Sequence, residues 1–429
     1  MADDGQRVVY VVSEELAKIS SLLPSNRNRS LLVHSLVKEY GLLATSSAAE
    51  AGAGEALPKA KILRPQPASY KDLSAYHSED YLRYVLDPRR SSGTQEPGRA
   101  QVTEDFGLED DCPLFPGVHR YVSLIAGASL SAAQALRTGQ ADVAICWDGG
   151  RHHAHKSRAS GFCYVADVVL AILALKRPLR GPPPPLPGEV ATAPAKPMVM
   201  YVDLDLHFAD GVCEAFASSH GTSGHSQILT LSIHHAAPGF FPASPLADLP
   251  VPDESGAADP FTLAVPLRQG LSGATLKEVW MRVVEPIKDA FFVRFVVLQC
   301  GVDGLAGDPC GIWNIDLESR SPSMGWCIGR AVHEWGCKTL LLGGGGYSSP
   351  NAARAWAYFT SIALGRPLPL DADIPDHSTF PVYAPSFVLD VPAGNMQDRN
   401  SLRDLANVEV MFTRVCDILR RRNGNANMR

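Results

Sequence analysis

The sequence lacks any uninterrupted apolar run of the roughly 18 residues that a membrane-spanning helix requires. Its N-terminus carries acidic residues where a secretory leader needs basic ones, so we expect neither a membrane anchor nor export. The chain also lacks a basic excess, because 39 Lys and Arg stand against 45 Asp and Glu, a net charge of −6. We therefore expect no direct binding to nucleic acid or to a membrane, whereas a basic partner is compatible with this charge.

The cysteines lack the regular spacing of a disulfide framework, and their number, nine, is odd. We interpret them as buried or free thiols, which indicates a reducing compartment. The composition is otherwise that of an ordinary globular protein, with 45% hydrophobic and 20% charged residues, and suffices for a complete core.

Short runs rich in Val, Ile and Leu alternate with longer segments of helical character. The runs span 142–147, 198–206, 227–234, 291–300 and 338–342. Continuous apolar runs are typical of strands covered on both faces, so they predict an α/β fold with a single open parallel sheet flanked by helices. We expect one domain over 1–429, with surface-loop insertions at 44–60 and 177–197 that are rich in Ala, Gly, Ser or Pro.

Polar residues follow these strand candidates, at the edge where open α/β sheets place their sites. In the run 201–207, strand period two puts Asp203, Asp205 and His207 on one face. Two carboxylates and an imidazole together favour a bound divalent cation, and Asp303 could supply a further ligand. The alternative is a set of ordinary turn carboxylates. A ligand set of one His and two Asp suits zinc, and iron(II), cobalt or manganese as well.

Two adjacent imidazoles, His152 and His153, follow a glycine pair. They can serve as a base and an acid if carboxylates orient them and separate their pKa values, and Asp203 and Asp210 are available for this. The alternative is an exposed His-rich patch, since His155 follows closely.

Four consecutive glycines, 343–346, precede Tyr347, whose hydroxyl could donate to a developing oxyanion. A plain tight turn is the simpler interpretation of the glycines alone. Phe162 and Phe241 lie on short loops bounded by Gly or Pro, where they either pack in the core or form the walls of a narrow apolar tunnel.

Together these motifs resemble the class I zinc-dependent histone deacetylases of the arginase/deacetylase superfamily, in particular the stand-alone branch and its fungal relatives. The matching segments cover nearly the whole chain and span 29–34, 152–164, 203–211, 238–242, 301–309, 341–347 and 374–377. The resemblance implies the arginase/deacetylase fold and hydrolysis of the acetyl amide of Nε-acetyl-lysine in histones and other proteins.

The resemblance also implies roles for individual residues. Asp205, His207 and Asp303 would bind zinc, with Fe²⁺ or Co²⁺ as substitutes, and zinc would activate the attacking water. Tyr347 would stabilise the oxyanion. His153, paired with Asp210, would act as the base and deliver a proton to the leaving amine, while His152, paired with Asp203, would give electrostatic support.

Further residues are implied to bind the substrate, the product and a second ion. The tunnel and pocket would be formed by Gly161, Phe162, Phe241 and Cys310. Asp111 would grip substrate backbone amides at the rim, and Arg29 would lie near an acetate channel close to the glycine run. A structural potassium ion would use Asp203, Asp205, His207 and Ser232.

The implied partners are acetylated histone tails or other acetyl-lysine proteins, within chromatin complexes that regulate transcription. The implied location is the nucleus, with the cytoplasm as an alternative. Other functions stay open: an acetylpolyamine deacetylase, for which Glu109 is a candidate gatekeeper, a deacylase for longer acyl-lysines, or a catalytically weak acyl-lysine-binding scaffold.

The sequence departs from the family pattern at several positions. Arg151 stands where the family has Trp or Leu, and we expect it to add charge near the rim and alter peptide preference. The positions aligned with the basic residues that bind inositol phosphate in corepressor-bound members hold Asn26, Pro309 and Pro350, which argues against that mode of binding.

Overall fold

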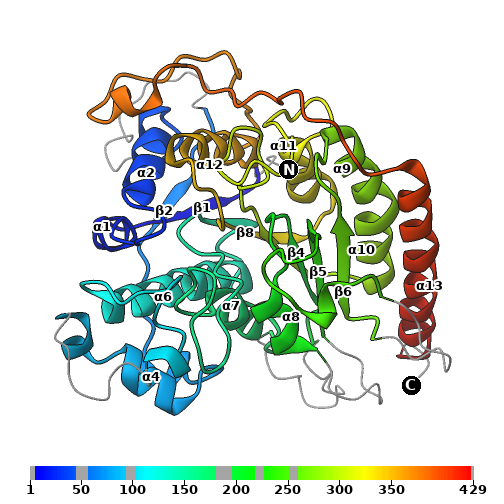
Figure 1. The fold of residues 1–429 in the computed structure, drawn as a ribbon, viewed down its shortest axis with the longest axis horizontal. Helices are drawn as coiled ribbons and strands as arrows, with labels where there is room; N and C mark the ends of the chain where they lie inside the picture. Colours follow the sequence, from blue (N-terminus) through cyan, green and yellow to red (C-terminus); the bar gives the residue numbers. More distant parts are fainter. Residues whose placement is uncertain are drawn as a thin grey trace, which may run out of the picture.

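The computed structural model describes residues 5–44, 57–92, 103–179, 196–217, 227–250 and 259–426. Its centre is an eight-stranded sheet in the order β2-β1-β3-β8-β7-β4-β5-β6, in which each pair of neighbours is parallel (Figure 1). The strands are β1 Val8–Val11, β2 Lys61–Leu63, β3 Val143–Cys146, β4 Val199–Asp203, β5 Ile228–His235, β6 Thr262–Leu267, β7 Phe295–Gln299 and β8 Lys338–Leu342. The predicted α/β fold with an open parallel sheet is confirmed.

Helices cover both faces of the sheet (Figure 1). The helices are α1 Glu14–Ser20, α2 Arg29–Glu39, α3 Tyr70–Leu73, α4 Glu79–Val85, α6 Val118–Arg137, α7 Asp167–Leu175, α8 Asp210–Phe216, α9 Gly273–Val279, α10 Glu285–Phe291, α11 Met324–Gly329, α12 Ser349–Ala363 and α13 Leu402–Ala426. Short 3₁₀ segments span Pro88–Ser92, Pro245–Ala247 and Phe380–Tyr383, and π-helical turns span Trp280–Val284 and Arg330–Glu334.

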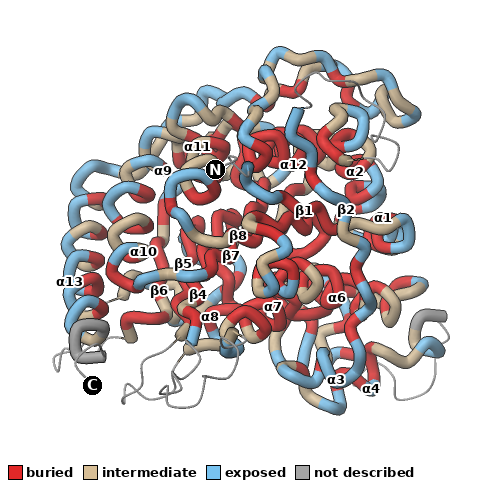
Figure 2. The backbone as a smooth tube through the Cα atoms, turned by 180° about the vertical axis from the view of Figure 1, so that it is seen from behind, coloured by how far each residue is buried: buried red, intermediate tan, exposed pale blue. Residues whose placement is uncertain are grey.

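The strands are apolar throughout because both of their faces are buried. Alternate residues of β1 separate into two cores: Val8 and Tyr10 pack in the core with α2 and α12, whereas Val9 and Val11 pack with α6 and α7. The sheet accordingly forms the buried centre of the molecule in Figure 2, with exposed residues on the outer helices. This two-sided burial explains why continuous apolar runs marked the strands.

The five predicted strands are all present; Lys338–Leu342 has the predicted bounds, and the ends of the other four differ. β4 ends at Asp203, three residues before the predicted end, so Asp205 and His207 lie in the following loop and not on a strand face. The run 291–300 contributes Phe291 to the end of α10 and begins its strand at Phe295. Most of the predicted insertions 44–60 and 177–197 lies outside the described residues.

All nine cysteines lie in the described part of the chain, and all are free thiols, as expected. No described helix is both long enough and apolar enough to span a membrane.

Candidate metal centre and active site

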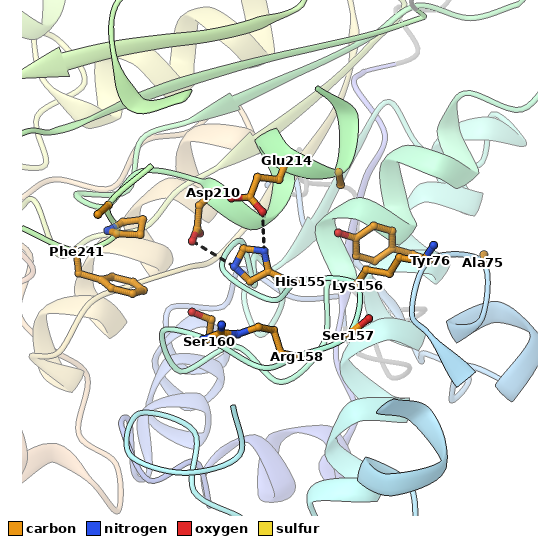
Figure 3. A pocket seen from close by; sticks show the side chains of 13 residues that line it. Ala75, Tyr76, His155, Lys156, Ser157, Arg158, Ser160, Asp210, Glu214 and Phe241 are labelled. Atoms are coloured by element: carbon orange, nitrogen blue, oxygen red, sulfur yellow. Dashed lines mark ion pairs between the residues drawn. The ribbon is translucent and has the colours of Figure 1, made fainter. Parts of the chain in front are cut away.

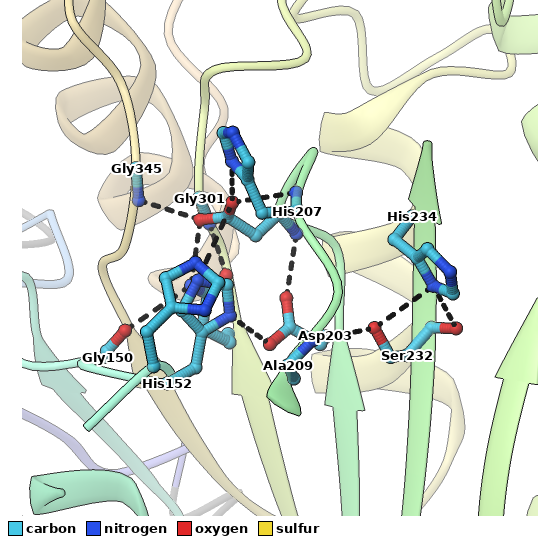
Figure 4. Close-up of polar contacts among 12 residues, drawn as sticks. Gly150, His152, Asp203, His207, Ala209, Ser232, His234, Gly301 and Gly345 are labelled. Atoms are coloured by element: carbon cyan, nitrogen blue, oxygen red, sulfur yellow. Dashed lines mark hydrogen bonds and ion pairs between the residues drawn. The ribbon is translucent and has the colours of Figure 1, made fainter. Parts of the chain in front are cut away.

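Three side chains, those of His207, Asp205 and Asp303, converge just beyond β4 and β7, which are neighbours in the sheet. Figure 4 shows His207 in the loop after β4. His207 Nδ1 lies 3.2 Å from Asp205 Oδ1 and 3.0 Å from Asp303 Oδ2. Both carboxylates are buried, while His207 keeps a partly exposed side chain. Donor atoms at about 2 Å from a tetrahedral metal ion lie roughly 3.3 Å apart, so the spacing is that of a ligand set.

The loops fix the directions of these carboxylates. Asp205 Oδ2 accepts hydrogen bonds from Gln299 Nε2 at 2.9 Å and from the Gly345 amide at 2.7 Å. Asp303 Oδ1 accepts from the Leu206 amide at 3.0 Å. A Cβ atom on Gly345 would lie 2.2 Å from Asp303 Oδ2, so the glycine run brings its backbone to the carboxylates because side chains are absent there.

The donor set fits a divalent cation. Burial and the nearby Asp205 carboxylate raise the pKa of Asp303, which means that two buried carboxylates at this spacing do not both stay ionised without a compensating charge. One imidazole nitrogen and two carboxylates suit zinc, iron(II) or cobalt. Cys310 Sγ lies within 4.8 Å of donor atoms of His207 and Asp303, so this half-buried thiol borders the centre.

The two adjacent imidazoles are each bonded to the carboxylate that the sequence predicts. His152 Nδ1 lies 2.7 Å from Asp203 Oδ2, and His153 Nδ1 lies 2.7 Å from Asp210 Oδ1. All four side chains are buried. The predicted alternative of an exposed His-rich patch is therefore wrong for His152 and His153.

The pairs differ in charge. Burial opposes the charge of His152, but Asp203 and Asp205 outweigh it and raise its pKa to about 9. Burial and the positive charge of His152 lower the pKa of His153 to about 4, against the effect of Asp210. These opposite pKa shifts favour the charged form of His152 and the neutral form of His153.

Aromatic side chains surround His153. Its ring centroid lies 5.0 Å from that of Phe241, and Phe162 contacts Tyr347 edge to face at 5.8 Å. Gly161 has φ +48°, and a Cβ there would lie 2.5 Å from His153 Cδ2. The structure thus brings together the predicted substrate residues Gly161, Phe162 and Phe241 beside the imidazoles.

An acidic pocket lies next to Phe241. Its lining includes the exposed carboxylates of Glu109, Asp110 and Asp111. The carboxylate of Glu109 accepts a hydrogen bond from the Thr103 hydroxyl. A second pocket, which Phe241 also lines, contains His155, whose ring nitrogens lie 3.4 Å from Asp210 Oδ2 and 3.0 Å from Glu214 Oε2 (Figure 3).

Arg29 contacts the glycine run, as the resemblance implied. Its Nη1 and Nη2 donate to the carbonyls of Gly346 at 2.7 Å and Gly344 at 3.0 Å. Arg151 is buried, with 4% of the residue exposed. The prediction that Arg151 adds charge near the rim is therefore wrong. Its side chain turns inward because Nη2 donates to the Asp148 carbonyl, at 2.9 Å.

Asp203 and Ser232 are direct neighbours on β4 and β5. Ser232 Oγ accepts from the Ala209 amide at 3.3 Å, and Asp203 Oδ1 accepts from the Asp205 amide at 2.8 Å (Figure 4). Asp203 and Ser232 thus both bind backbone amides of the loop after β4, which carries the other two predicted potassium ligands, Asp205 and His207.

Two further residues, Gln299 and Tyr201, support the site and were not predicted from the sequence. Gln299 binds both Asp205 and the Gly301 amide, and Tyr201 donates to Asp203. Gln299 is the last residue of the buried strand β7. A polar residue at the end of an apolar run was the sequence signal that could have identified it as part of the site.

A parallel α/β sheet with a His–Asp–Asp centre and two His–Asp pairs at its carboxyl edge defines a hydrolase of the arginase/deacetylase fold. The histone deacetylase domain profile matches residues 24–363, and the chain belongs to the histone deacetylase family. It is a hydrolase that acts on acetyl-lysine.

Several relatives match over most of their length. Histone deacetylase 8 of Xenopus tropicalis is 34% identical over 394 residues, 91% of this chain and 93% of the relative. Histone deacetylase 8 of Danio rerio is 34% identical over 95% of each chain. Histone deacetylase RPD3 of Saccharomyces cerevisiae is 31% identical over 93% of this chain and 81% of its own length.

Proposed function

We propose that the chain is a zinc-dependent lysine deacetylase that removes the acetyl group of Nε-acetyl-lysine in histones and other proteins. The observation that carries the proposal is the geometry of the two carboxylate-bonded imidazoles, His152–Asp203 and His153–Asp210, next to the His207–Asp205–Asp303 centre. When bound, the metal ion supplies Lewis-acid activation of water and of the amide carbonyl. Fe²⁺ and Co²⁺ are alternative ions for the same donors.

His153 is the general base and then the general acid. Asp210 holds the His153 Nδ1–H, so Nε2 is free to accept a proton from the attacking water. The same nitrogen then protonates the amine as the C–N bond breaks, and acetate and lysine leave. His152 keeps its proton and stabilises the negative charge that develops beside it.

Tyr347 donates its hydroxyl hydrogen to the carbonyl oxygen as that oxygen becomes negative. Burial and the carboxylates of Asp303 and Asp205 raise the pKa of this phenol, so it stays protonated. Phe162 and Phe241 form apolar walls for the lysine methylenes, with Gly161 and Cys310 completing the pocket. An apolar passage favours an acetylated amine over a charged ammonium.

The acidic pocket beside Phe241 suits a basic peptide such as a histone tail, with Asp111 binding backbone amides. Asp203, Asp205, His207 and Ser232 bind a structural potassium ion behind the zinc site. Arg29 receives the product acetate at the glycine run. The chain acts in the nucleus within chromatin complexes.

The test is acetate release from an acetyl-lysine peptide by the zinc-loaded protein, beside Asp205→Ala, acetylspermidine and a longer acyl-lysine peptide. We expect turnover of the acetyl peptide that Asp205→Ala loses. Preference for acetylspermidine would assign a polyamine deacetylase, and preference for the longer acyl group would assign a different deacylase. Peptide binding without any turnover would assign a binding scaffold.

A further inference from the structure

A large pocket lies beside the proposed tunnel wall, on the loop that follows the catalytic imidazoles. Its volume is about 860 Å³, and Phe241 is one of the residues that line it. The loop contributes four consecutive polar side chains to the same pocket, those of His155, Lys156, Ser157 and Arg158 (Figure 3). The three residues of the metal centre do not line it, so the pocket belongs to the surroundings of the tunnel and not to the reacting centre.

Two of these side chains, Lys156 and Arg158, form a cation pair without partners. Both residues are exposed. Neither side chain has an ion pair within 4.0 Å or a hydrogen bond to any other residue in the part of the chain that the structure describes, whereas the neighbouring His155 has two such partners. The cation pair is therefore available to a ligand that enters the pocket.

The carboxylates of the pocket do not compensate the cation pair, because imidazoles hold them. Asp210 Oδ1 is bonded to His153 Nδ1 at 2.7 Å, and Asp210 Oδ2 lies 3.4 Å from His155 Nε2. Glu214 Oε2 lies 3.0 Å from His155 Nδ1 (Figure 3). The contact with Asp210 raises the pKa of His155, which favours its charged form. The two negative charges are thus matched inside the pocket, and the cation pair is left over.

Backbone hydrogen bonds fix the loop that presents the cation pair. The Lys156 carbonyl accepts from the Ser78 amide at 2.9 Å, and the Ala159 amide donates to the Phe106 carbonyl at 2.9 Å. The loop is therefore tied to two other segments of the chain at positions close to both cations. A ligand does not have to order this backbone, which reduces the entropic cost of binding.

The pocket adjoins the acidic pocket of Glu109, Asp110 and Asp111. The two pockets share Arg158, Ser160 and Phe241 in their linings and otherwise consist of different residues. The rim beside the tunnel wall thus has an acidic part and a basic part. A peptide whose acetylated side chain enters the tunnel directs its two flanks differently, so we expect each part of the rim to meet a different flank.

We propose that this pocket binds an anionic side chain in one flank of the peptide substrate, with a phosphorylated serine or threonine as the group that fits it best. A phosphate carries up to two negative charges and three acceptor oxygens, which match the cation pair and the hydroxyls of Ser157 and Ser160. A carboxylate carries one charge and uses fewer of these donors. The inference rests on the proposed function and deepens it, because it makes the preferred substrate basic on one flank and anionic on the other.

The test measures peptide binding and does not depend on turnover. Fluorescence anisotropy compares acetyl-lysine peptides that differ at one position, which holds serine, glutamate or phosphoserine, on either flank of the acetyl-lysine. For the zinc-loaded protein we expect a Kd about 10-fold lower for phosphoserine than for serine, on one flank only, and about 3-fold lower for glutamate, since exposed charge pairs each contribute little. The preference should weaken in about 0.5 M salt, which screens exposed charges.

Variants assign the preference to the cation pair. Lys156→Gln/Arg158→Gln should bring the serine and phosphoserine peptides to nearly the same Kd, and Lys156→Glu/Arg158→Glu should make the phosphoserine peptide the weaker ligand. The matched control is Lys277→Gln/Arg414→Gln, which removes two exposed cations on α9 and α13 that line neither pocket. The control should keep the preference, because the net charge changes equally but the pocket is intact.

The outcomes separate the pocket from the proposed function. Equal Kd values for serine and phosphoserine in the wild type, absence of peptide binding, or a preference that survives in Lys156→Gln/Arg158→Gln would overturn the inference. Equal gains for glutamate and phosphoserine would support a site for acidic residues, and a gain for phosphoserine alone would support a phosphate site. Acetate release from the same peptides is measured separately. Its absence would refute the proposed function, while the ratio of Kd values would still test the pocket.

Discussion

At the residue scale, His152 and His153 have different functions although they are the same residue type and adjacent in sequence. His152 is bonded to Asp203 and lies 3.7 Å from Asp205, whereas His153 has the single partner Asp210 on its Nδ1 and a cation beside it. The neighbouring carboxylates therefore make one imidazole a cation and leave the other a base.

Substitution of each imidazole in turn tests this assignment. We expect His153→Ala to lower kcat on an acetyl-lysine peptide by about 10²- to 10⁴-fold, because the proton acceptor is lost. His152→Ala should lower kcat by a smaller factor, since water or salt can replace part of the charge of His152. Steady-state kinetics of the two variants measures the difference. A larger loss of kcat for His152→Ala than for His153→Ala would contradict the assignment and make His152 the base.

Gly161 provides a second test at this scale. Gly161 and Gly365 both have positive φ, +48° and +70°, but only a Cβ on Gly161 would contact a catalytic side chain. Ala at either position should cost about 1 kcal/mol of backbone strain. Gly161→Ala should in addition lower kcat/KM roughly 100-fold, because it displaces His153. Equal activities for Gly161→Ala and Gly365→Ala would show that the fit against His153 is unimportant.

At the element scale, the loops after β3, β4, β7 and β8 carry most of the site, and the strands only position them. The apolar runs predicted the five strands that lie side by side in the middle of the sheet, β3, β8, β7, β4 and β5, and missed β1, β2 and β6. β2, at one edge, has only three residues and is partly exposed, so its composition gives no comparable pattern. Tyr201 and Asp203 lie two residues apart on the same face of β4, and their hydrogen bond was not predicted although strand period two allows it.

The two catalytic His–Asp pairs were predictable from the sequence, whereas the position of Arg151 was not. Their motifs are specific, and the predicted pairs His152–Asp203 and His153–Asp210 are present. The inward position of Arg151 was not predictable, because an arginine in a loop usually faces solvent. Its burial follows from contacts with Asp148 and Asp167, which the sequence places near it without indicating the direction of the side chain.

The start of α7 depends on a histidine from a distant loop. His77 Nε2 accepts a hydrogen bond from the Ala166 amide at 3.0 Å, so the imidazole must be neutral there. Burial lowers the pKa of His77 from 6.5 to about 4, against the effect of the Lys156 carbonyl. The unfolded chain therefore binds a proton between these values that the folded chain excludes, and the stability from this group falls as the pH falls from 6.5 to 4.

His77→Gln should remove this part of the pH dependence. The wild type should lose about 2 kcal/mol more of its unfolding free energy between pH 7.5 and pH 5 than the variant does. Urea unfolding at the two pH values measures the difference, and the other buried histidines cancel because both proteins contain them. An equal change of the unfolding free energy between the two pH values in both proteins would mean that protonation of His77 does not cost the hydrogen bond from the Ala166 amide.

At the scale of the whole molecule, charge and chemistry are arranged around one edge of the sheet. The exposed carboxylates of Glu109, Asp110 and Asp111 lie beside Phe241, while the buried centre lies below the loops. On the proposed function, we expect this rim to attract a basic peptide although its reacting group, the acetylated lysine, is neutral.

Removal of rim charge should change binding and not chemistry. In Glu109→Gln/Asp110→Asn, KM for an acetyl peptide with basic flanks should rise about 3- to 10-fold, roughly 1 kcal/mol, with kcat unchanged. Asn suits position 110, where φ is +40°. KM for a peptide with acidic flanks is the control and should fall or stay constant. An equal rise of KM for both peptides would indicate damage to the rim instead of lost attraction.

The central claim is that the His207–Asp205–Asp303 centre binds a divalent metal ion that hydrolysis of acetyl-lysine requires. The most direct measurement is acetate release by the protein before chelation, after chelation, and after addition of zinc, with bound metal quantified in each sample and in Asp205→Ala. We predict about one zinc per chain at this centre, activity that disappears with the metal and returns with it, and neither metal nor activity in Asp205→Ala. Full acetate release by metal-free protein, or by Asp205→Ala without metal, would contradict the account.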